Sequence, residues 1–419
     1  MRWTEMRYVR TYNKTILSNG LTLITHHEAT TPLVSVNLLY NVGARDENPE
    51  KTGFAHLFEH LMFGGSKNIP DYDYYSNKAG AENNAFTNND ITNYYITLPA
   101  QYLETALWME SDRMNELAFS DKSLQVQRNV VIEEFKQRYL NQPYGDVWLL
   151  LRPLAYKQHP YRWCTIGKDI SHIENATMDD VKQFFYKFYR PCNAIMSIAG
   201  NIDEQATIAM VEKWFGSIPS GTPYVRQLPA EPEQTEPRTL TVHRDVPSNA
   251  IYKAYKMSHR MCHDYYVYDL ISDILSNGKS SRLYNELVVK DKLYTELNAF
   301  ISGDADEGLF IFVGKLVDGV DMTTAENALL EQIEKLKNDT IEEYELQKVK
   351  NKLEITFLYS QYKVLDRAMN LAYFDWLGNI DLINNEPQCY AAVTTDDIKR
   401  VANQTFTPQH CSTLYYLKK

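Results

Sequence analysis

The sequence has few cysteines and no long apolar run. Its 419 residues include five cysteines, which lie far apart and form no C-x-x-C pair, so they fit free thiols in a reducing compartment better than a disulfide framework. No stretch approaches the roughly 18 apolar residues of a membrane-spanning helix, and the N-terminal segment lacks the apolar region of a signal peptide. We expect a protein of the cytoplasm, or of the periplasm if a signal peptide has been removed.

Basic residues are scarce relative to acidic ones. Lys and Arg total 43, Asp and Glu total 54, and the formal net charge is −11. Nucleic acids and anionic membranes both attract concentrated positive charge, so neither is expected as the main partner. Hydrophobic residues make up 44% and charged residues 23% of the chain, which is typical of a folded globular protein and excludes a wholly disordered one.

Prolines mark a boundary near the middle of the chain. Residues 217–238 hold five of the sixteen prolines among polar residues, a composition typical of an extended linker. The flanking segments, 1–216 and 239–419, share an order of landmarks: a β-rich stretch, an apolar helix that ends in glycine, and a closing helix, strand and turn. We therefore predict two homologous α+β domains, each a mainly antiparallel sheet with flanking helices. Any α+β domain offers such landmarks, but their shared order favours duplication.

Residues 53–65, GFAHLFEHLMFGG, carry the strongest chemical signal. Thr52 is the expected N-cap of a helix of about three turns. The helix is apolar except for His56, Glu59 and His60. Positions i and i+4 share a helix face, so both imidazoles are expected to point at one place. Burying them is costly unless a metal ion binds them, and Zn²⁺ suits two imidazoles plus an oxygen ligand with one open position.

The spacing H-x-x-E-H is the inverted form of the H-E-x-x-H zinc-protease motif. In that chemistry Glu59 does not bind the metal but holds the attacking water and accepts its proton. The alternative is a pair of core histidines with backbone partners, which this five-residue pattern in an apolar helix disfavours. A third ligand is expected on the helix within 123–140, where periodicity does not choose between Glu133 and Glu134.

With these motifs the sequence resembles the pitrilysin and mitochondrial-processing-peptidase family of zinc metallopeptidases, especially its small bacterial members. In that family a liganding glutamate lies in a later E-R-x-V-V-x-x-E helix, which residues 127–134, QRNVVIEE, match. The resemblance selects Glu134 and implies one Zn²⁺ per chain, held by His56, His60 and Glu134. Gln127 replaces the family's upstream glutamate, a change expected to alter the local charge without removing a ligand.

Residues 80–99, GAENNAFTNNDITNYYITLP, resemble a further family segment. By resemblance this segment contains an edge strand that pairs with the substrate backbone, a mode that accepts many sequences. The strand residues are Asn83, Asn84, Ala85, Phe86 and Thr87. The segment by itself also fits an ordinary Asn-rich hairpin. Further matches at 159–167, 189–193 and 277–287 extend the resemblance over nearly the whole chain.

One part of the family pattern is missing. Members that cleave peptides unaided carry an Arg and a Tyr seven residues apart in the second half, and the matching positions here are Val288 and Thr295. Tyr294 lies one residue away, and on a strand that shift turns a side chain to the other face. Some relatives divide labour between a zinc subunit and a zinc-less partner. We therefore expect a heterodimer with a homologous subunit that lacks H-x-x-E-H, or alternatively a homodimer.

The function that the resemblance implies is zinc-dependent endopeptidase activity on short or unfolded peptides, inside a chamber enclosed by two such chains. The competing functions are a non-catalytic core or assembly subunit of a processing-peptidase-like complex, and a subunit that binds peptides without cutting them. An intact set of His56, Glu59, His60 and Glu134 argues against the core or assembly subunit, because a scaffold has no need of it. Glu59→Gln would separate the peptide-binding alternative from the enzyme.

Overall fold

The computed structural model of the protein describes residues 9–419. Residues 1–8, on which the expectation of a missing signal peptide partly rests, lie outside the described residues. The chain forms two compact units. Unit 1 comprises the described residues up to Phe135, Cys164–Leu228 and Leu358–Asn385, and unit 2 comprises Lys136–Trp163, Pro229–Phe357 and Glu386–Lys419. Among residues 9–419, no helix is both long and apolar enough to cross a membrane.

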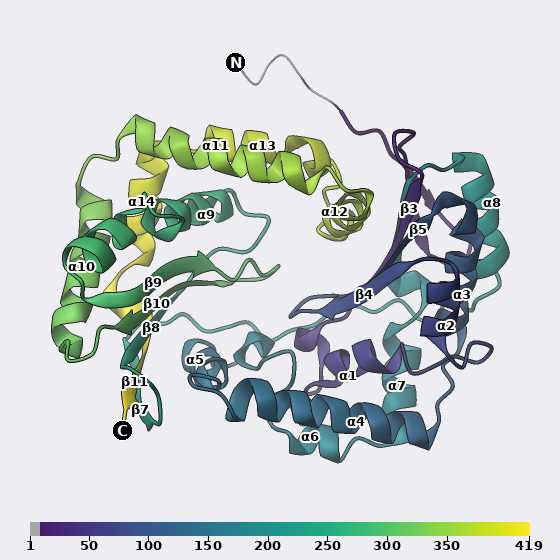
Figure 1. The fold of residues 1–419 in the computed structure, drawn as a ribbon, viewed down its shortest axis with the longest axis horizontal. Helices are drawn as coiled ribbons and strands as arrows, with labels where there is room; N and C mark the ends of the chain where they lie inside the picture. Colours follow the sequence, from purple (N-terminus) through teal and green to yellow (C-terminus); the bar gives the residue numbers. More distant parts are fainter. Residues whose placement is uncertain (1–8) are drawn as a thin grey trace. The chain divides into compact units, whose positions relative to one another are not determined.

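Unit 1 is built on a six-stranded sheet in the order β1-β2-β6-β3-β5-β4 (Figure 1). Its strands are β1 (Asn13–Ile16), β2 (Thr22–His27), β3 (Leu33–Tyr40), β4 (Glu82–Thr87), β5 (Thr92–Pro99) and β6 (Ala194–Gly200). Only the β2–β6 pair is parallel. The central strand β3 is buried from Val34 to Tyr40. Its two buried polar side chains have partners on β5: Ser35 hydrogen-bonds to Thr97 at 2.7 Å, and Asn37 accepts from the Asn93 amide at 2.7 Å.

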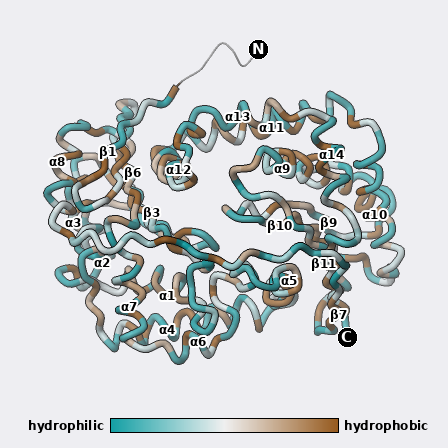
Figure 2. Tube along the Cα trace, turned by 180° about the vertical axis from the view of Figure 1, so that it is seen from behind, coloured by the Kyte–Doolittle hydropathy of each residue, from teal (hydrophilic) through white to brown (hydrophobic). Residues whose placement is uncertain are grey.

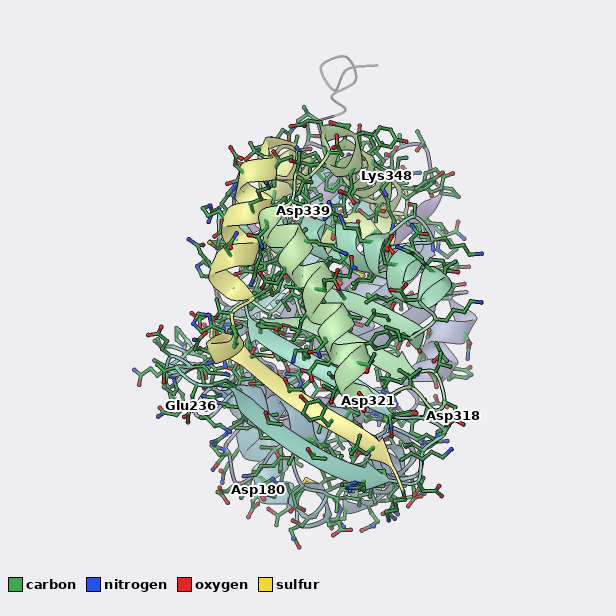
Figure 3. All side chains as sticks on the ribbon, turned by 90° about the vertical axis from the view of Figure 1, so that its left-hand side faces the viewer. Asp180, Glu236, Asp318, Asp321, Asp339 and Lys348 are labelled. Atoms are coloured by element: carbon green, nitrogen blue, oxygen red, sulfur yellow. The ribbon has the colours of Figure 1, made fainter. Side chains whose placement is uncertain are left out.

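Unit 2 is built on a five-stranded sheet in the order β7-β11-β8-β10-β9. Its strands are β7 (Arg238–Arg244), β8 (Ala250–Lys256), β9 (Tyr294–Ile301), β10 (Leu309–Leu316) and β11 (Cys411–Lys418). Strands β7 and β11 lie side by side (Figure 3) and form the only parallel pair of this sheet. When the extra edge strand β1 is set aside, both sheets have the same strand order and the same parallel pair. The predicted α+β fold with two like sheets is confirmed.

Helices flank both sheets. In unit 1 they are α1 (Phe54–Leu61), α2 (Tyr72–Lys78), α3 (Leu103–Asn115), α4 (Asp121–Phe135), α6 (Ser171–Glu174), α7 (Met178–Phe188), α8 (Glu204–Phe215) and α12 (Val364–Trp376). In unit 2 they are α5 (Val147–Ala155), α9 (His263–Ser276), α10 (Met322–Asn338) and α14 (Thr395–Thr405). The chain passes between the units within α11 (Glu343–Ser360) and α13 (Leu382–Ala392). Hydrophobic and hydrophilic positions alternate along the helices (Figure 2), as expected for helices with one buried face.

The closing helices of the two halves begin in the same way. Helix α7 starts with a capping box between Thr177 and Asp180, and α14 starts with one between Thr394 and Asp397. In each box the threonine hydroxyl accepts from the backbone N–H three residues later, and the aspartate accepts from the threonine N–H. Helix α7 leads into β6, which pairs in parallel with β2, and α14 leads into β11, which pairs in parallel with β7. This repeated local chemistry agrees with duplication.

The packing units do not follow the order of the sequence. The predicted boundaries 1–216, 217–238 and 239–419 describe the duplicated halves and stay a prediction. Each compact unit also contains a helix from the other half of the sequence. Helix α5 packs on the second sheet, where Val147 and Leu151 share a core with Tyr252 and Leu414. Residues 219–235, within the predicted linker, form neither helix nor strand.

Helix α12 of the second half packs on the first sheet, against β3 and β6. Ala372 shares a core with Leu39, and the Ser197 hydroxyl donates to the Ala368 carbonyl at 2.5 Å. The small side chains of α12 allow this close approach. An ion pair between Arg367 of α12 and Glu28, which follows β2, holds the helix in place.

Glu28 is expected to contribute to stability in a pH-dependent way. Hydrogen bonds from Thr30, supported by Arg367 and opposed by burial, lower the pKa of Glu28 to about 2. A carboxyl group with a depressed folded-state pKa stabilises the fold above its unfolded pKa of about 4.3 and loses that contribution as the pH falls toward 2. Glu28→Gln should therefore lower the free energy of unfolding at pH 7 by about 2–3 kcal/mol, and by less at pH 3, as measured by chemical denaturation.

A surface glutamate provides the control for this prediction. Glu104 pairs with Lys213, and both side chains are about half exposed. Glu104→Gln is expected to cost less than about 1 kcal/mol at pH 7, because exposed ion pairs contribute little. Equal losses in the two variants at pH 7 would contradict a special role for the pair of Glu28 and Arg367.

Candidate metal site and active site

The helix that carries the inverted motif begins at a glycine. Gly53, the N-cap of α1, has a φ of +89°, and a Cβ there would lie 2.6 Å from the Ile166 carbonyl oxygen. The prediction that Thr52 is the N-cap was wrong: its hydroxyl instead accepts from the Lys168 N–H at 2.9 Å. The cap is supplied by Glu47, whose carboxylate accepts from the backbone N–H groups of Gly53 and Ala55 at 2.9 and 2.8 Å.

Aromatic packing fixes the buried side of α1. Phe58 is fully buried and stacks on Phe184 of α7, with ring centroids 4.8 Å apart, and on Tyr189 at 5.2 Å. The Tyr94 hydroxyl of β5 donates to the Phe58 carbonyl at 3.3 Å. The apolar residues of the motif therefore anchor the helix in the core, and its polar residues face the other way.

Gly53→Ala is expected to disturb the start of α1. An alanine there meets both an unfavourable left-handed φ, which costs about 1–2 kcal/mol, and the contact with Ile166. We expect the free energy of unfolding to fall by more than about 2 kcal/mol, and zinc binding to weaken. Gly80, at a φ of +64° with open space around it, is the matched control: Gly80→Ala should cost only the backbone term. Equal losses in the two variants would show that the Ile166 contact is unimportant.

Two imidazoles and one carboxylate converge from two helices. The ligand atoms of His56, His60 and Glu134 all lie within 4.8 Å of one another. His56 and His60 lie one turn apart on α1, and Glu134 comes from α4, which packs against α1. The distances from a Glu134 carboxylate oxygen to the Nε2 atoms of His56 and His60 are 3.7 and 3.5 Å. The three side chains are 12%, 23% and 17% exposed, so the cluster is accessible but largely desolvated.

These distances fit a metal better than direct hydrogen bonds. Hydrogen bonds between nitrogen and oxygen cluster at about 2.7–3.2 Å, and both separations are longer. Ligand atoms bound to Zn²⁺ at about 2.0–2.1 Å in a tetrahedron lie about 3.4 Å apart. The donor set of two imidazoles and one carboxylate with an open side is also the one that catalytic zinc uses.

The structure separates the two glutamates that periodicity did not distinguish. Glu133 is exposed on the outer side of α4, whereas Glu134 is half-buried and joins the histidines. Gln127 is half-buried on the same face of the helix as Glu134, two turns earlier. Its expected place beside the metal ligands stays a prediction.

Glu59 contacts the end of the predicted substrate strand and lies close to the converging groups His60 and Glu134. Burial raises its pKa, while hydrogen bonds from the Thr87 hydroxyl and backbone N–H, together with nearby His60, lower it in part. Thr87 is the last residue of β4, and its hydroxyl oxygen also lies 3.5 Å from the Ala55 carbonyl oxygen of α1. The carboxyl group that the motif assigns to proton transfer thus lies at the end of this strand.

Residues 83–87 form the edge strand that the resemblance implied. Strand β4 pairs only with β5, so one side of its backbone is open. On the open side, the Ala85 N–H donates to the Asn84 side chain at 2.8 Å. The Asn83 side chain donates to Ser76 at 2.7 Å. In an antiparallel pair every second residue directs its N–H and C=O outward, which at this edge means Asn83, Ala85 and Thr87. Substrate pairing at this edge stays a prediction.

The structure explains why Tyr294 does not replace the missing tyrosine. Tyr294, the first residue of β9, is buried, and its hydroxyl donates to the Ala325 carbonyl at 2.8 Å. Thr295 points to the other face, is exposed, and donates to the Lys315 carbonyl. Val288 packs against the core of unit 2. The one-residue shift therefore has the expected effect: the tyrosine belongs to the core.

Sequence reasoning missed Glu47. It lies six residues before Gly53 in an irregular segment, where no periodicity marks it. Only its chemistry in the structure marks it. Glu47 is 6% exposed, and a buried carboxylate needs hydrogen-bond donors, which the unpaired backbone N–H groups at a helix N-terminus provide.

Comparisons with known proteins identify the family. Residues 22–152 match the family model described as insulinase (peptidase family M16), and residues 175–353 match the model described as the peptidase M16 inactive domain. The converging groups His56, His60 and Glu134 all lie in the first match. The second match contains none of them and covers strands β7 to β10 of the second sheet.

Individual relatives extend over the whole chain. The zinc protease PqqE of Helicobacter pylori is 30% identical over 97% of this chain and 93% of its own length. A crystal structure of a protease from Helicobacter pylori superposes with a TM-score of 0.91 at 29% identity, covering 97% of this chain and all of that one. The beta subunit of the mitochondrial processing peptidase of Saccharomyces cerevisiae is 27% identical over 48% of this chain and 44% of its own length. The chain therefore belongs to peptidase family M16, the family of pitrilysin and the mitochondrial processing peptidase.

Proposed function

We propose that this chain is a zinc-dependent endopeptidase that hydrolyses short or unfolded peptides. The observation that carries the proposal is the convergence of His56, His60 and Glu134 within 4.8 Å, next to Glu59 and an open strand edge. Membership of family M16 and the names of its zinc-protease relatives support the same activity.

The roles follow from the chemistry of each group. His56, His60 and Glu134 would hold one Zn²⁺ per chain, which when bound polarises a carbonyl and lowers the pKa of water. Glu59 is not one of the converging groups. It orients the attacking water, accepts its proton, and returns that proton to the amine nitrogen that leaves.

The open edge of β4 explains the choice of substrate. An extended peptide can add to this edge through backbone hydrogen bonds, with little demand on its side chains. Because β4 ends at Thr87, which contacts Glu59, a peptide paired there passes the proton-transferring carboxyl group. Short or unfolded peptides present extended backbone of this kind freely, whereas folded proteins protect most of their edge strands, which agrees with the chamber for short or unfolded peptides that the family resemblance implies.

We further propose that the working enzyme contains a second, homologous subunit. Val288 and Thr295 stand where relatives that act alone carry Arg and Tyr, and Tyr294 is engaged in the core. A similar relative, the mitochondrial-processing peptidase beta protein, is itself named as a subunit. A partner that lacks H-x-x-E-H would supply the missing groups. A homodimer with altered substrate handling is the alternative.

The proposal is tested by measuring zinc content and peptide turnover together. We expect about one zinc per chain by elemental analysis, and turnover of quenched-fluorescence peptides that a chelator removes and zinc restores. Adding the candidate partner should raise turnover. Full activity of the purified chain alone would contradict partner dependence. Zinc binding without turnover, with or without partner, would instead favour a peptide-binding or assembly subunit.

A further inference from the structure

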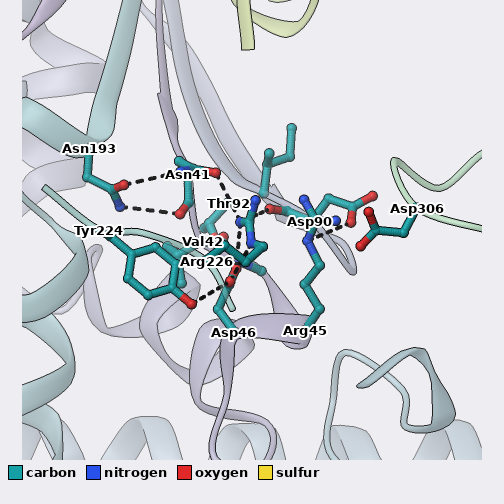
Figure 4. Close-up of polar contacts among 12 residues, drawn as sticks. Asn41, Val42, Arg45, Asp46, Asp90, Thr92, Asn193, Tyr224, Arg226 and Asp306 are labelled. Atoms are coloured by element: carbon teal, nitrogen blue, oxygen red, sulfur yellow. Dashed lines mark hydrogen bonds and ion pairs between the residues drawn. The ribbon is translucent and has the colours of Figure 1, made fainter. Parts of the chain in front are cut away.

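Three consecutive buried charged residues join three elements of unit 1. Arg45, Asp46 and Glu47 lie in and directly after a short 3₁₀ helix, η1 (Ala44–Asp46), and are 4%, 9% and 6% exposed. Each side chain binds a different part of the unit, and Figure 4 shows the contacts of Arg45 and Asp46. Buried charges are costly unless they are paired, so these contacts fix the segment firmly.

The Glu47 side chain binds the start of α1, the helix that carries His56 and His60. Both of its carboxylate oxygens accept hydrogen bonds from the first turn of α1, at Gly53 and Ala55. Ala55 directly precedes His56. Each oxygen holds one backbone N–H group. A movement of Glu47 would therefore move the first turn of α1, which carries His56.

The Asp46 side chain binds the proline-rich segment between the two halves. Arg226 donates from Nε to one carboxylate oxygen of Asp46 at 2.6 Å and from Nη2 to the other at 2.8 Å. The Tyr224 hydroxyl and the Gly43 N–H add bonds of 3.0 and 2.9 Å. Arg226 also donates to Asn41 at the end of β3. This two-point geometry fixes both the distance and the orientation of the aspartate.

The Arg45 side chain binds the turn that leads from the edge strand. Its Nε pairs with Asp90 at 3.0 Å, and its backbone N–H donates to the Asn89 carbonyl at 2.9 Å. Asp90 lies between β4 and β5. The segment 45–47 is therefore bonded both to the start of α1 and to the turn that follows β4. The proposed reaction takes place between these two elements.

We propose that Arg226 is a positioning residue for the metal-binding helix. Removing its guanidinium leaves the buried carboxylate of Asp46 without its cationic partner, a strongly unfavourable state. A shift of residues 45–47 toward water would hydrate the Asp46 carboxylate and relieve this cost. Because Glu47 binds the first turn of α1, the same shift would displace the start of that helix. The inference rests on the proposed function, since it concerns the zinc affinity of the site that α1 helps to form.

The test compares Arg226→Gln with Arg367→Gln in the full chain. Both arginines pair with a buried carboxylate of unit 1, but Arg367 has no contact with η1 or α1 among those observed. Zinc dissociation constants are measured by competition with a chromophoric chelator, and the stability of the zinc-free chain by denaturation. Outer-shell changes weaken metal binding by roughly 10–100-fold. We expect about a tenfold loss for Arg226→Gln and less than about a twofold change for Arg367→Gln, although both lower stability.

Two further variants establish the route. Glu47→Gln should weaken zinc binding, and adding Arg226→Gln to it should cost no more, because both act through the same segment. Arg226→Lys should recover part of the affinity, since it restores the charge but not the two-point geometry. Unchanged zinc affinity in Arg226→Gln, with stability lowered as in Arg367→Gln, would overturn the inference alone. Absence of zinc binding in the unaltered chain would overturn the proposed function and this inference with it.

Discussion

Glu59→Gln is expected to lower kcat for peptide hydrolysis by about 10²–10⁴-fold, the usual contribution of a positioned general acid–base group. The amide of glutamine cannot accept a proton from water or return one to the leaving amine. It retains the shape of the side chain and an oxygen that accepts the hydrogen bonds from Thr87. The zinc content should therefore stay at about one per chain, and the KM for peptides should change little.

The measurement is steady-state hydrolysis of a fluorogenic peptide, with zinc determined on the same preparation. Loss of turnover with zinc retained separates a chemical role from a structural one. Unchanged turnover would exclude the proposed proton transfer. Loss of both zinc and turnover would show that Glu59 acts as a ligand or supports the fold.

Glu134→Gln should have the largest effect on metal binding. A neutral amide oxygen is a weaker ligand than a carboxylate, and it leaves only the two imidazoles of α1 as strong donors. We expect the zinc dissociation constant to rise by more than the roughly 10–100-fold that outer-shell changes produce. Peptide turnover should fall with the loss of zinc and recover partly at high zinc concentration.

Glu133 is the matched control for this prediction. It is the adjacent residue on the same helix, carries the same charge, and is exposed. Glu133→Gln therefore repeats the change in net charge and the change in residue type at the end of α4. Zinc binding in this variant should equal that of the unaltered chain. A similar loss in both variants would assign the effect to the charge of α4 rather than to coordination.

The sequence predicts the local part of the site well. Two histidines one turn apart must lie on the same face of a helix, so their convergence follows from helical geometry alone. The third ligand depends on how α4 packs against α1, a contact between residues far apart in the chain. Periodicity accordingly leaves Glu133 and Glu134 equivalent, and the choice requires either the family pattern or the packing.

The start of α1 shows the same limit. Thr52 has the residue type that commonly caps helices, but Gly53 takes a left-handed conformation and Glu47 supplies the carboxylate. A cap from outside the adjacent residues has no local signature. Arg226 is a comparable case, because an arginine in a proline-rich segment gives no indication of the buried aspartate that it binds.

The composition of the two units also depends on long-range packing. The hydrophobic patterns of α5 and α12 indicate that each helix has one buried face. They do not indicate which of the two sheets that face packs against. The fold class and the duplication follow from repeated local landmarks, whereas the strand order comes from the structure. The exchange of helices between the halves follows from complementary surfaces, such as Ala372 against Leu39, that only the folded chain brings together.

That exchange has a consequence for the order in which the protein forms during synthesis. The first sheet is complete once β6 has been made, but the helix that covers one of its faces ends at Trp376. Until the ribosome has added those residues, the face around Leu39 has no partner from α12. Unit 1 therefore closes late, after most of unit 2 has been translated. Separating the halves at the proline-rich segment would leave this face of the first sheet permanently uncovered and prone to aggregation.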